Sequence, residues 1–275
     1  MSDTTDAPTV IGTTVLHRVH AAVSTITLNR PEAGNALLPE QREALIALLD
    51  AAATDRTVRV VVLRSEGRHF CTGADVGTIR AAQAGGAAGV GDGMRRIMQG
   101  AQRLVAAVLD CPKPVVAVVQ GAAAGLGAHL ALACDMVVAS EQAYFLEPFL
   151  LRGIVVDGGG AYPLPRLVGL QRAKELAFLG DRLPAAEAKE LGLVNRVVAP
   201  DALEAAAGEL AARLAKAPTS ALALTKALFN RSLDGDRAAS FLAEGMAQEL
   251  QSHSGDATEG IAAFAERRDP DFRGF

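Results

Sequence analysis

Tryptophan is absent from this 275-residue sequence, which also has only two tyrosines and three cysteines. Cys71, Cys111 and Cys134 stand in apolar surroundings, with no CxxC pair and no histidines at metal-ligand spacing. This pattern excludes a disulfide framework as the basis of the fold and predicts reduced, buried thiols. We expect no bound metal.

Long apolar runs and an excess of basic residues are also missing. The apolar run at residues 115–119 is far too short to cross a bilayer. The acidic, polar first ten residues are typical of neither a signal peptide nor a transit peptide. A formal net charge of −4 at pH 7 offers no basic surface for nucleic acid. The sequence therefore predicts a cytoplasmic protein that binds neither nucleic acid nor membranes.

Strand and helix patterns follow one another over the first 200 residues, and helical patterns fill the rest. We expect one α/β core domain over residues 1–200 and a helical C-terminal region over residues 201–275. The segment AAQAGGAAGVGDG (81–93) is too rich in glycine and alanine to pack tightly, so it predicts either a mobile segment beside a site or disorder. The expected strands are 23–28, 58–63, 115–120, 136–139 and 192–198, and the expected helices are 37–53, 94–109, 126–134, 171–179, 185–191 and 257–267, the last opened by a capping box of Asp256 and Glu259.

A glycine-spaced turn, GAAAGLG (121–127), joins a β-branched strand to a small-residue helix. Such a turn can bind the phosphates of a dinucleotide at the helix N-terminus, as in short-chain dehydrogenases. Two observations oppose that reading. More than a hundred residues precede the turn, and Tyr144 and Tyr162 lack the lysine four residues on that would lower the tyrosine pKa.

A second turn, GRHFCTGAD (67–75), also runs from a strand toward a helix, which we expect to begin at Ala74. Two such turns at the ends of neighbouring parallel strands can aim two backbone N–H groups at one point. Fixed donors of this kind stabilise an enolate or a tetrahedral oxyanion. Gly73 and Gly125 would let the backbone approach a ligand closely.

Six motifs in order resemble the enoyl-CoA hydratase/isomerase (crotonase) superfamily, from about residue 12 to the C-terminus. They are NRPEAGNAL (29–37), GRHFCTGAD (67–75), KPVVAVVQGAAAGLGAHLALACD (113–135), GIVVDGGGAYPLPRLVG (153–169), AKELGLVNRVV (188–198) and EGIAAFAERRDPDF (259–272). The resemblance implies an α/β fold, a crotonase-like spiral of ββα units with a helical C-terminal region. It also implies a homotrimer or a dimer of trimers.

The resemblance further implies an acyl-CoA thioester as substrate and no separate cofactor, because coenzyme A is part of the substrate. By motif position, the amides of Ala74 and Leu126 form the oxyanion hole. Asp75 and Val76 line the adenine pocket. Phe264 and Arg267 match positions that reach the nucleotide end, often of a neighbouring subunit, although Phe264 could instead anchor the last helix in the core and Arg267 could be a solvated charge.

Departures from the family pattern concern the two glutamates with which a hydratase activates water. Their positions hold His129 and Phe149 in this sequence. Phe149 cannot transfer a proton, so the hydration machinery is absent unless Glu147 takes its place. His129 is expected to line the pocket from one face of its helix.

One acid remains in the right region, Asp157, at the position where double-bond isomerases of the family carry a lone Asp or Glu. A single carboxylate in apolar surroundings, with a raised pKa, can take a proton from C2 and return it at C4. Asp157 could also serve as the N-cap of the following helix. The sequence therefore favours an enoyl-CoA isomerase, with an enoyl-CoA hydratase or a non-catalytic acyl-CoA-binding protein as alternatives.

Overall fold

The computed structural model describes residues 9–11, 14–78, 80, 89–232 and 234–274. Within them the strands form a sheet of seven and a sheet of three. The larger sheet consists, in spatial order, of β1 (Thr9–Ile11), β2 (Val15–His20), β3 (Val23–Leu28), β4 (Val60–Ser65), β5 (Val115–Val119), β7 (Met136–Ser140) and β10 (Arg196–Val198). The smaller sheet consists of β6 (Ala122–Ala124), β8 (Tyr144–Leu146) and β9 (Leu183–Pro184).

Strands β3, β4, β5, β7 and β10 run parallel, and β1 and β2 are antiparallel additions at one edge. The α-helices are α1 (Pro39–Thr54), α3 (Asp92–Arg96), α4 (Arg103–Asp110), α5 (Leu126–Ala133), α6 (Pro163–Leu179), α7 (Ala185–Glu190), α8 (Leu203–Ala215), α9 (Thr219–Ser232), α10 (Arg237–Ser252) and α11 (Gly255–Glu266). A π-helical turn, η2 (Ile97–Gln102), joins α3 to α4, and short 3₁₀ turns are η1 (Pro31–Ala33), η3 (Leu150–Arg152) and η4 (Pro200–Ala202).

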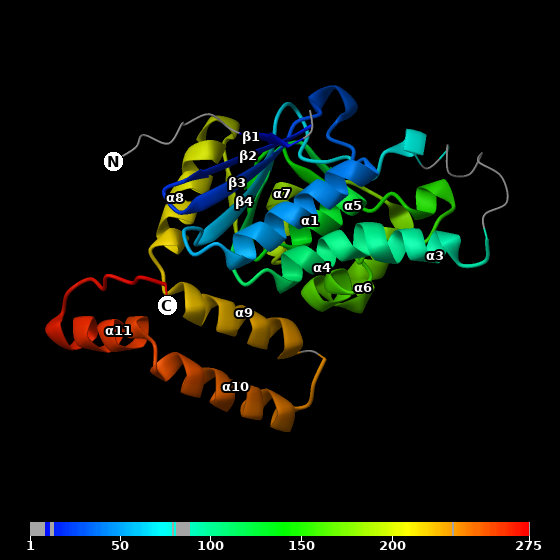
Figure 1. Cartoon of the computed structure of the whole chain (residues 1–275). Coiled ribbons are helices and arrows are strands. Elements are labelled where there is room, and N and C mark those ends of the chain that lie inside the picture. The colour runs from blue at the N-terminus through cyan, green and yellow to red at the C-terminus, as the bar shows by residue number, and fades with distance from the viewer. Residues whose placement is uncertain (1–8, 12–13, 79, 81–88, 233, 275) are drawn as a thin grey trace.

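The central strands β4, β5 and β7 are buried on both faces, as their content of β-branched residues predicts. Successive side chains point to opposite faces, so Val60 and Val62 of β4 pack against α8, whereas Val61 and Leu63 face α1, α4 and α5. Figure 1 shows α1 and α4 side by side over one face of the sheet and α8 on the other. α8 therefore belongs to the packed core, although we expected it to fall within a separate C-terminal region.

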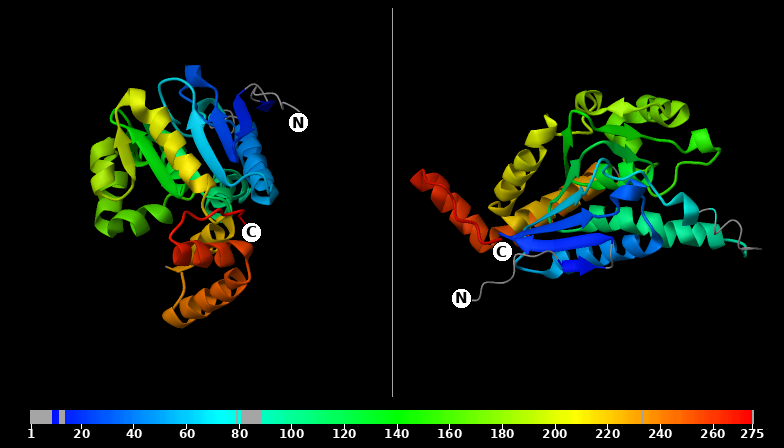
Figure 2. Two further views of the ribbon diagram at one scale, coloured as in Figure 1. Left: turned by 90° about the vertical axis from the view of Figure 1, so that its left-hand side faces the viewer. Right: turned by 90° about the horizontal axis from the view of Figure 1, so that it is seen from above.

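The C-terminal helices α9, α10 and α11 extend away from the two sheets (Figures 1 and 2). α9 is fixed to the core by Lys226, whose Nζ donates to Asp135 Oδ2 at 2.8 Å and to the Val108 carbonyl at 3.0 Å. Arg59 ties the chain end to the same region, since its guanidinium donates to the carbonyls of Ala217 and Phe272. α10 and α11 make few such contacts and form the outer part of the molecule.

Several elements confirm the sequence predictions. The strands expected at 23–28, 58–63 and 115–120 are β3, β4 and β5 to within two residues. Cys71, Cys111 and Cys134 are buried free thiols, as predicted. None of the described helices combines the length and the apolar character needed to cross a membrane. Most of the segment 81–93, expected to be mobile or disordered, lies outside the described residues.

Two local predictions are wrong. The glycine turn contains a strand, β6, because Ala122–Ala124 pairs in parallel with β8. Ala74 does not begin a helix, since it forms a parallel bridge with Leu37 and helical residues start at Val76. The helix predicted at 171–179 is confirmed as the second part of α6, which follows a kink at Gly169, whose φ of 76° is outside the helical region; the first part of α6, from Pro163, was not predicted.

The predicted capping box of the last helix is also wrong. Ser254 is the N-cap of α11, and its hydroxyl accepts from the Ala257 N–H at 3.0 Å. Asp256 is buried and accepts from the backbone N–H groups of Arg273 and Gly274, at 2.7 and 2.8 Å. Asp256 therefore secures the final residues against the start of α11 instead of capping the helix.

Replacing Asp256 by alanine should free the last residues of the chain, because two partly buried N–H groups would lose a charged acceptor. We expect a loss of about 2 kcal/mol in the free energy of unfolding and faster amide hydrogen exchange at Arg273 and Gly274. Ser254→Ala serves as the matched control, since it should cost about 1 kcal/mol without exposing these two amides. Unchanged protection of Arg273 and Gly274 in Asp256→Ala would contradict this role.

Candidate active site

The loop that carries the first predicted amide is held by a fully buried asparagine. Asn35 Oδ1 accepts from the Arg30 N–H at 2.8 Å, and its Nδ2 donates to the carbonyls of Glu66 and His69 at 2.9 and 2.7 Å. Asn35 adopts a φ of 56°, a region that asparagine tolerates better than most residues. These bonds fix the chain just before Phe70 and so determine where residues 71–75 lie.

The backbone around Ala74 leaves its N–H directed away from Leu37. The Leu37 N–H donates to the Gly73 carbonyl at 2.8 Å, and the Asp75 N–H donates to the Leu37 carbonyl at 3.1 Å. In a parallel bridge of this pattern, the N–H of the bridged residue itself points to the opposite side of the strand. The chain segment on that opposite side is the one that leads into α5.

Residues 71–74 and the start of α5 approach each other closely. The Cys71 N–H donates to the Ala122 carbonyl at 3.0 Å, and the Ala124 N–H donates to the Cys71 carbonyl at 2.9 Å. A Cβ on Gly73 would lie 3.9 Å from Leu126 N, and a Cβ on Gly127 would lie only 2.2 Å from the Cys71 carbonyl oxygen. Glycine at positions 73 and 127 is what permits this approach.

Leu126 is the first residue of α5, so its N–H has no acceptor within the helix and lies at the positive end of the helix dipole. Gly125 precedes it with φ 52° and ψ −121°, a conformation that suits glycine. Ala74 and Leu126 thus lie on neighbouring stretches of backbone, since a Cβ on Gly73 would lie 3.9 Å from Leu126 N. This is an arrangement that can hold a single oxygen atom.

The two positions at which the family carries glutamates are buried and in contact with each other. His129, on α5, is 1% exposed, and Phe149, which follows β8, is 6% exposed. Their rings stack with a centroid separation of 5.3 Å and an interplanar angle of 7°. His129 is therefore packed in the interior, against Phe149.

Glu147 is not available to replace a catalytic glutamate in this structure. Its carboxylate, 5% exposed, lies 3.0 Å from His129 Nε2 through Oε2. Sequence reasoning missed this pair because the two residues are 18 positions apart, and the pairing depends on how β8 lies beside β6.

Asp157 lies in a turn between η3 and α6 and is half-buried. Burial raises the pKa of its carboxyl, which is the predicted direction, and the charges of a protonated His129 and of Arg42 on α1 oppose the rise. Gly158, the next residue, lies close to the N-terminal end of α5, which carries the Leu126 amide. A Cβ on Gly158 would lie 3.2 Å from Leu126 Cδ1. The alternative role as an N-cap is wrong, because Tyr162 caps α6.

The residues expected at the coenzyme A end are not gathered into one site within the chain. Asp75 pairs with Arg30 at 2.8 Å and accepts from the Thr78 N–H at 3.0 Å, so its carboxylate fixes the local fold. Val76 is half-exposed beside it. Phe264 is 87% exposed and Arg267 follows α11, far from α5 in Figure 1. Phe264 is therefore not a core anchor of its own chain.

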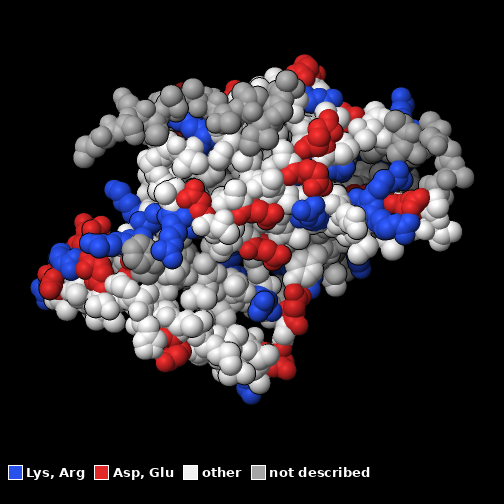
Figure 3. All heavy atoms as spheres, in the orientation of Figure 1, with Lys and Arg blue, Asp and Glu red and all other residues white. Residues whose placement is uncertain are grey.

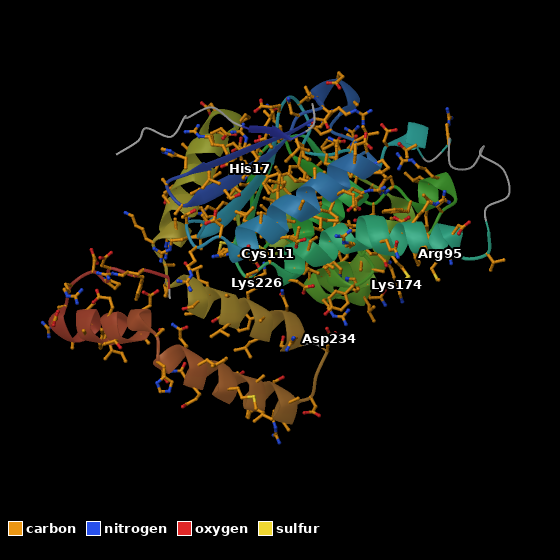
Figure 4. The ribbon with its side chains drawn as sticks, viewed as in Figure 1. His17, Arg95, Cys111, Lys174, Lys226 and Asp234 are labelled. Atoms are coloured by element: carbon orange, nitrogen blue, oxygen red, sulfur yellow. The ribbon has the colours of Figure 1, made fainter. Side chains whose placement is uncertain are left out.

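A cavity of about 450 Å³ lies at the other end of α5, where α6 and α9 meet the core, away from the two amides. Its polar lining residues have partners. Lys226 donates to Asp135, and Arg166 donates to Asp234 (Figure 4 labels Lys226 and Asp234). No group of histidine, cysteine, aspartate and glutamate suited to a metal ion occurs among the described residues.

Comparison with known proteins identifies the family. The enoyl-CoA hydratase/isomerase family model matches residues 18–274. A 1,2-epoxyphenylacetyl-CoA isomerase of Escherichia coli is 37% identical over 260 residues, which cover 94% of this chain and 98% of the relative. A 2,3-dehydroadipyl-CoA hydratase of the same organism is 35% identical over 249 residues, covering 90% and 94%.

Solved structures agree with this. An enoyl-CoA hydratase/isomerase from Cupriavidus metallidurans superposes with a TM-score of 0.88 at 38% identity, covering 95% of this chain and 97% of the other. The predicted fold, a crotonase-like spiral of ββα units followed by helices, is confirmed. With its backbone match spanning nearly the whole chain, this protein belongs to the enoyl-CoA hydratase/isomerase family of the crotonase superfamily.

Proposed function

We propose that this enzyme shifts a carbon–carbon double bond of an enoyl-CoA between positions 3 and 2, or isomerises a ring by the analogous step. The observation that carries the proposal is a lone half-buried carboxylate, Asp157, packed beside the helix end that bears the Leu126 amide.

In the proposed mechanism the thioester oxygen accepts hydrogen bonds from the N–H groups of Ala74 and Leu126. Holding that oxygen makes the protons on C2 acidic, because the negative charge of the enolate then falls on an oxygen with fixed donors. Asp157 takes a proton from C2 of a 3-enoyl-CoA and returns it at C4, which leaves the double bond at position 2. Asp157 ends in its starting protonation state, and no other group has to exchange a proton. Coenzyme A takes part only as a portion of the substrate.

Hydration is the second candidate, since a relative of similar identity is a hydratase. It is disfavoured here because the two carboxylates that would position water are replaced by a histidine and a phenylalanine, and because Glu147 is bound to that histidine. A non-catalytic acyl-CoA-binding protein is the third candidate. It would bind the thioester without exchanging the protons on C2 in heavy water.

Asp157→Asn should lower the rate of 3-enoyl-CoA isomerisation about 10²- to 10⁴-fold, because the amide cannot take the proton, while thioester binding is retained. Absorbance of the conjugated 2-enoyl thioester follows the reaction, and calorimetry follows binding. Asp50→Asn, at an exposed position on α1, is the control and should leave the rate unchanged. Hydration of 2-enoyl-CoA that survives in Asp157→Asn would instead favour the hydratase.

The isomerase should lose activity as the pH falls through the pKa of Asp157. Because burial raises that pKa, the acid limb of kcat/KM should have its midpoint above about 3.9, the ordinary value for aspartate. The carboxylate form is the base, so activity is present above the midpoint and lost below it. A pH–rate profile measured on a substrate without titratable groups near the thioester tests this. A midpoint at or below the ordinary value would contradict a buried base.

We also propose that the enzyme works in the cytoplasm as a trimer or a dimer of trimers, and that Phe264 and Arg267 reach the nucleotide end of a neighbouring subunit's site. Large apolar side chains on the outer helices support assembly, since a single chain leaves them exposed. Those exposed by more than half are Phe229, Phe241, Leu242, Met246, Leu250, Ile261 and Phe264. Figure 3 shows that the surface over α9 and α10 is mostly uncharged.

Light scattering after size-exclusion chromatography should give three or six times the chain mass of 28.4 kDa. Phe241→Glu should shift the protein toward the monomer, because a charge on an apolar interface has to be desolvated. Gln142→Glu, in an exposed turn before β8, should not. A wild-type protein that elutes as a monomer at micromolar concentration would overturn the proposed assembly.

A further inference from the structure

We propose that Glu147 and His129 form a buried positioning pair, in which His129 Nδ1 accepts a hydrogen bond from the protonated carboxyl of Asp157 during the reaction. Neither residue touches the substrate in this proposal, which rests on the proposed function of Asp157.

The Nε2 side of His129 is occupied by Glu147. The 3.0 Å separation between Nε2 and Glu147 Oε2, with both side chains buried, requires a proton on Nε2, because an ionised carboxylate can only accept. In a neutral imidazole the lone pair then belongs to Nδ1. Glu147 therefore selects the tautomer in which Nδ1 is an acceptor.

The Nδ1 side is buried and has no hydrogen-bond partner within the described part of the chain. A buried polar atom without a partner costs free energy, and a buried charged N–H without one costs more. In the ring tautomer with its proton on Nε2, Nδ1 is therefore an acceptor without a partner. An unfilled acceptor inside a site indicates a donor that is present only at some stage of the reaction.

The turn that carries Asp157 is shaped around the ring of His129. A Cβ on Gly158 would lie 3.5 Å from Nδ1, and a Cβ on Gly160 would lie only 2.0 Å from Nε2. Phe149 stacks on the ring as well. The ring therefore packs closely against Gly158 and Gly160, the backbone that directly follows Asp157.

The chemistry of Asp157 supplies the missing donor. The aspartate that has taken a proton from C2 carries an O–H group, and an acceptor at Nδ1 would stabilise that form. The proton stays on Asp157 and returns to C4, so no charge is left behind. The titratable and charged groups facing Asp157 are His129 from α5 and Arg42 from α1, and those facing His129 are Glu147 and Asp157.

The direction in which the Asp157 pKa changes distinguishes a hydrogen-bonding role of His129 from a purely electrostatic one. An accepting Nδ1 favours protonated Asp157, so removing it should lower the Asp157 pKa. A protonated His129 would favour the carboxylate, so removing it should raise the same pKa. His129→Gln keeps an amide near Glu147 but places nothing at Nδ1. Glu147→Gln can donate to Nε2 and so turns Nδ1 into a donor.

The test is carbon-13 NMR titration of the Asp157 carboxyl in the full-length enzyme, together with nitrogen-15 NMR of the histidine rings. We expect an Nε2-protonated His129 in the wild type and a lower Asp157 pKa in both His129→Gln and Glu147→Gln. We also expect kcat about tenfold lower, the rate equivalent of one lost hydrogen bond. His129→Asn, which restores a polar group near Nδ1, should recover part of that loss.

His17→Gln is the matched control, because His17 Nε2 also lies 3.0 Å from one partner, Ser24 Oγ, but on β2 (Figure 4). It should change neither the Asp157 pKa nor kcat. An Nδ1-protonated His129 in the wild type, or an Asp157 pKa that rises or stays constant in the two variants, would overturn the proposal. If the wild-type enzyme isomerises no enoyl-CoA, the proposed function fails, and the two NMR measurements still decide whether the pair acts on Asp157.

Discussion

The site depends on the close approach of two stretches of backbone, residues 71–74 and the segment that leads into α5. Two hydrogen bonds between Cys71 and the β6 strand set their separation, and glycines at positions 73 and 127 make it sterically possible. A donor built from backbone needs no particular side chain, which is why Leu126 is compatible with the proposed oxyanion hole. The catalytic capacity of the fold therefore lies in its backbone geometry, and the side chains around it determine which reaction follows.

Those side chains differ from a hydratase pattern in a coordinated way. Phe149 removes one proton-transfer group, and its ring stacks on His129, which takes the place of the other. Glu147, the nearby acid that could have compensated, is bound to the histidine. The three residues are buried, and the ring of His129 lies against Gly158 and Gly160 of the Asp157 turn. In the proposed function, Asp157 is then the single carboxylate that acts on the substrate. A site that must move one proton between two carbons of the same molecule gains from buried neighbours of this kind, because stray water would exchange the proton.

The sequence predicted the strands of the larger sheet well because their β-branched runs are local and buried on both faces, as in β4 and β5. The sequence-based prediction failed where strand pairing or side-chain contacts between distant segments override the local sequence pattern. β6 is three alanines that no propensity favours as a strand, yet it pairs with β8. Asp256 and Glu259 have the spacing of a capping box, but tertiary partners take both side chains. The His129–Glu147 contact was missed for the same reason, whereas the prediction for Asp157 rests on its position within a motif and needs no knowledge of distant contacts.

The C-terminal helices place a different constraint on the site. Lys226 and Arg59 fix α9 and the chain end to the core through buried or partly buried donors, so these parts keep their position in a single chain. α10 and α11 lack comparable anchors and expose apolar side chains, among them Phe264 at 87%. Helices of this kind gain stability mainly from tertiary packing, and that packing has to come from another surface. If that surface is a second copy of the chain, then completing the nucleotide end of the site and burying these helices are the same event, and assembly becomes a condition for binding the substrate.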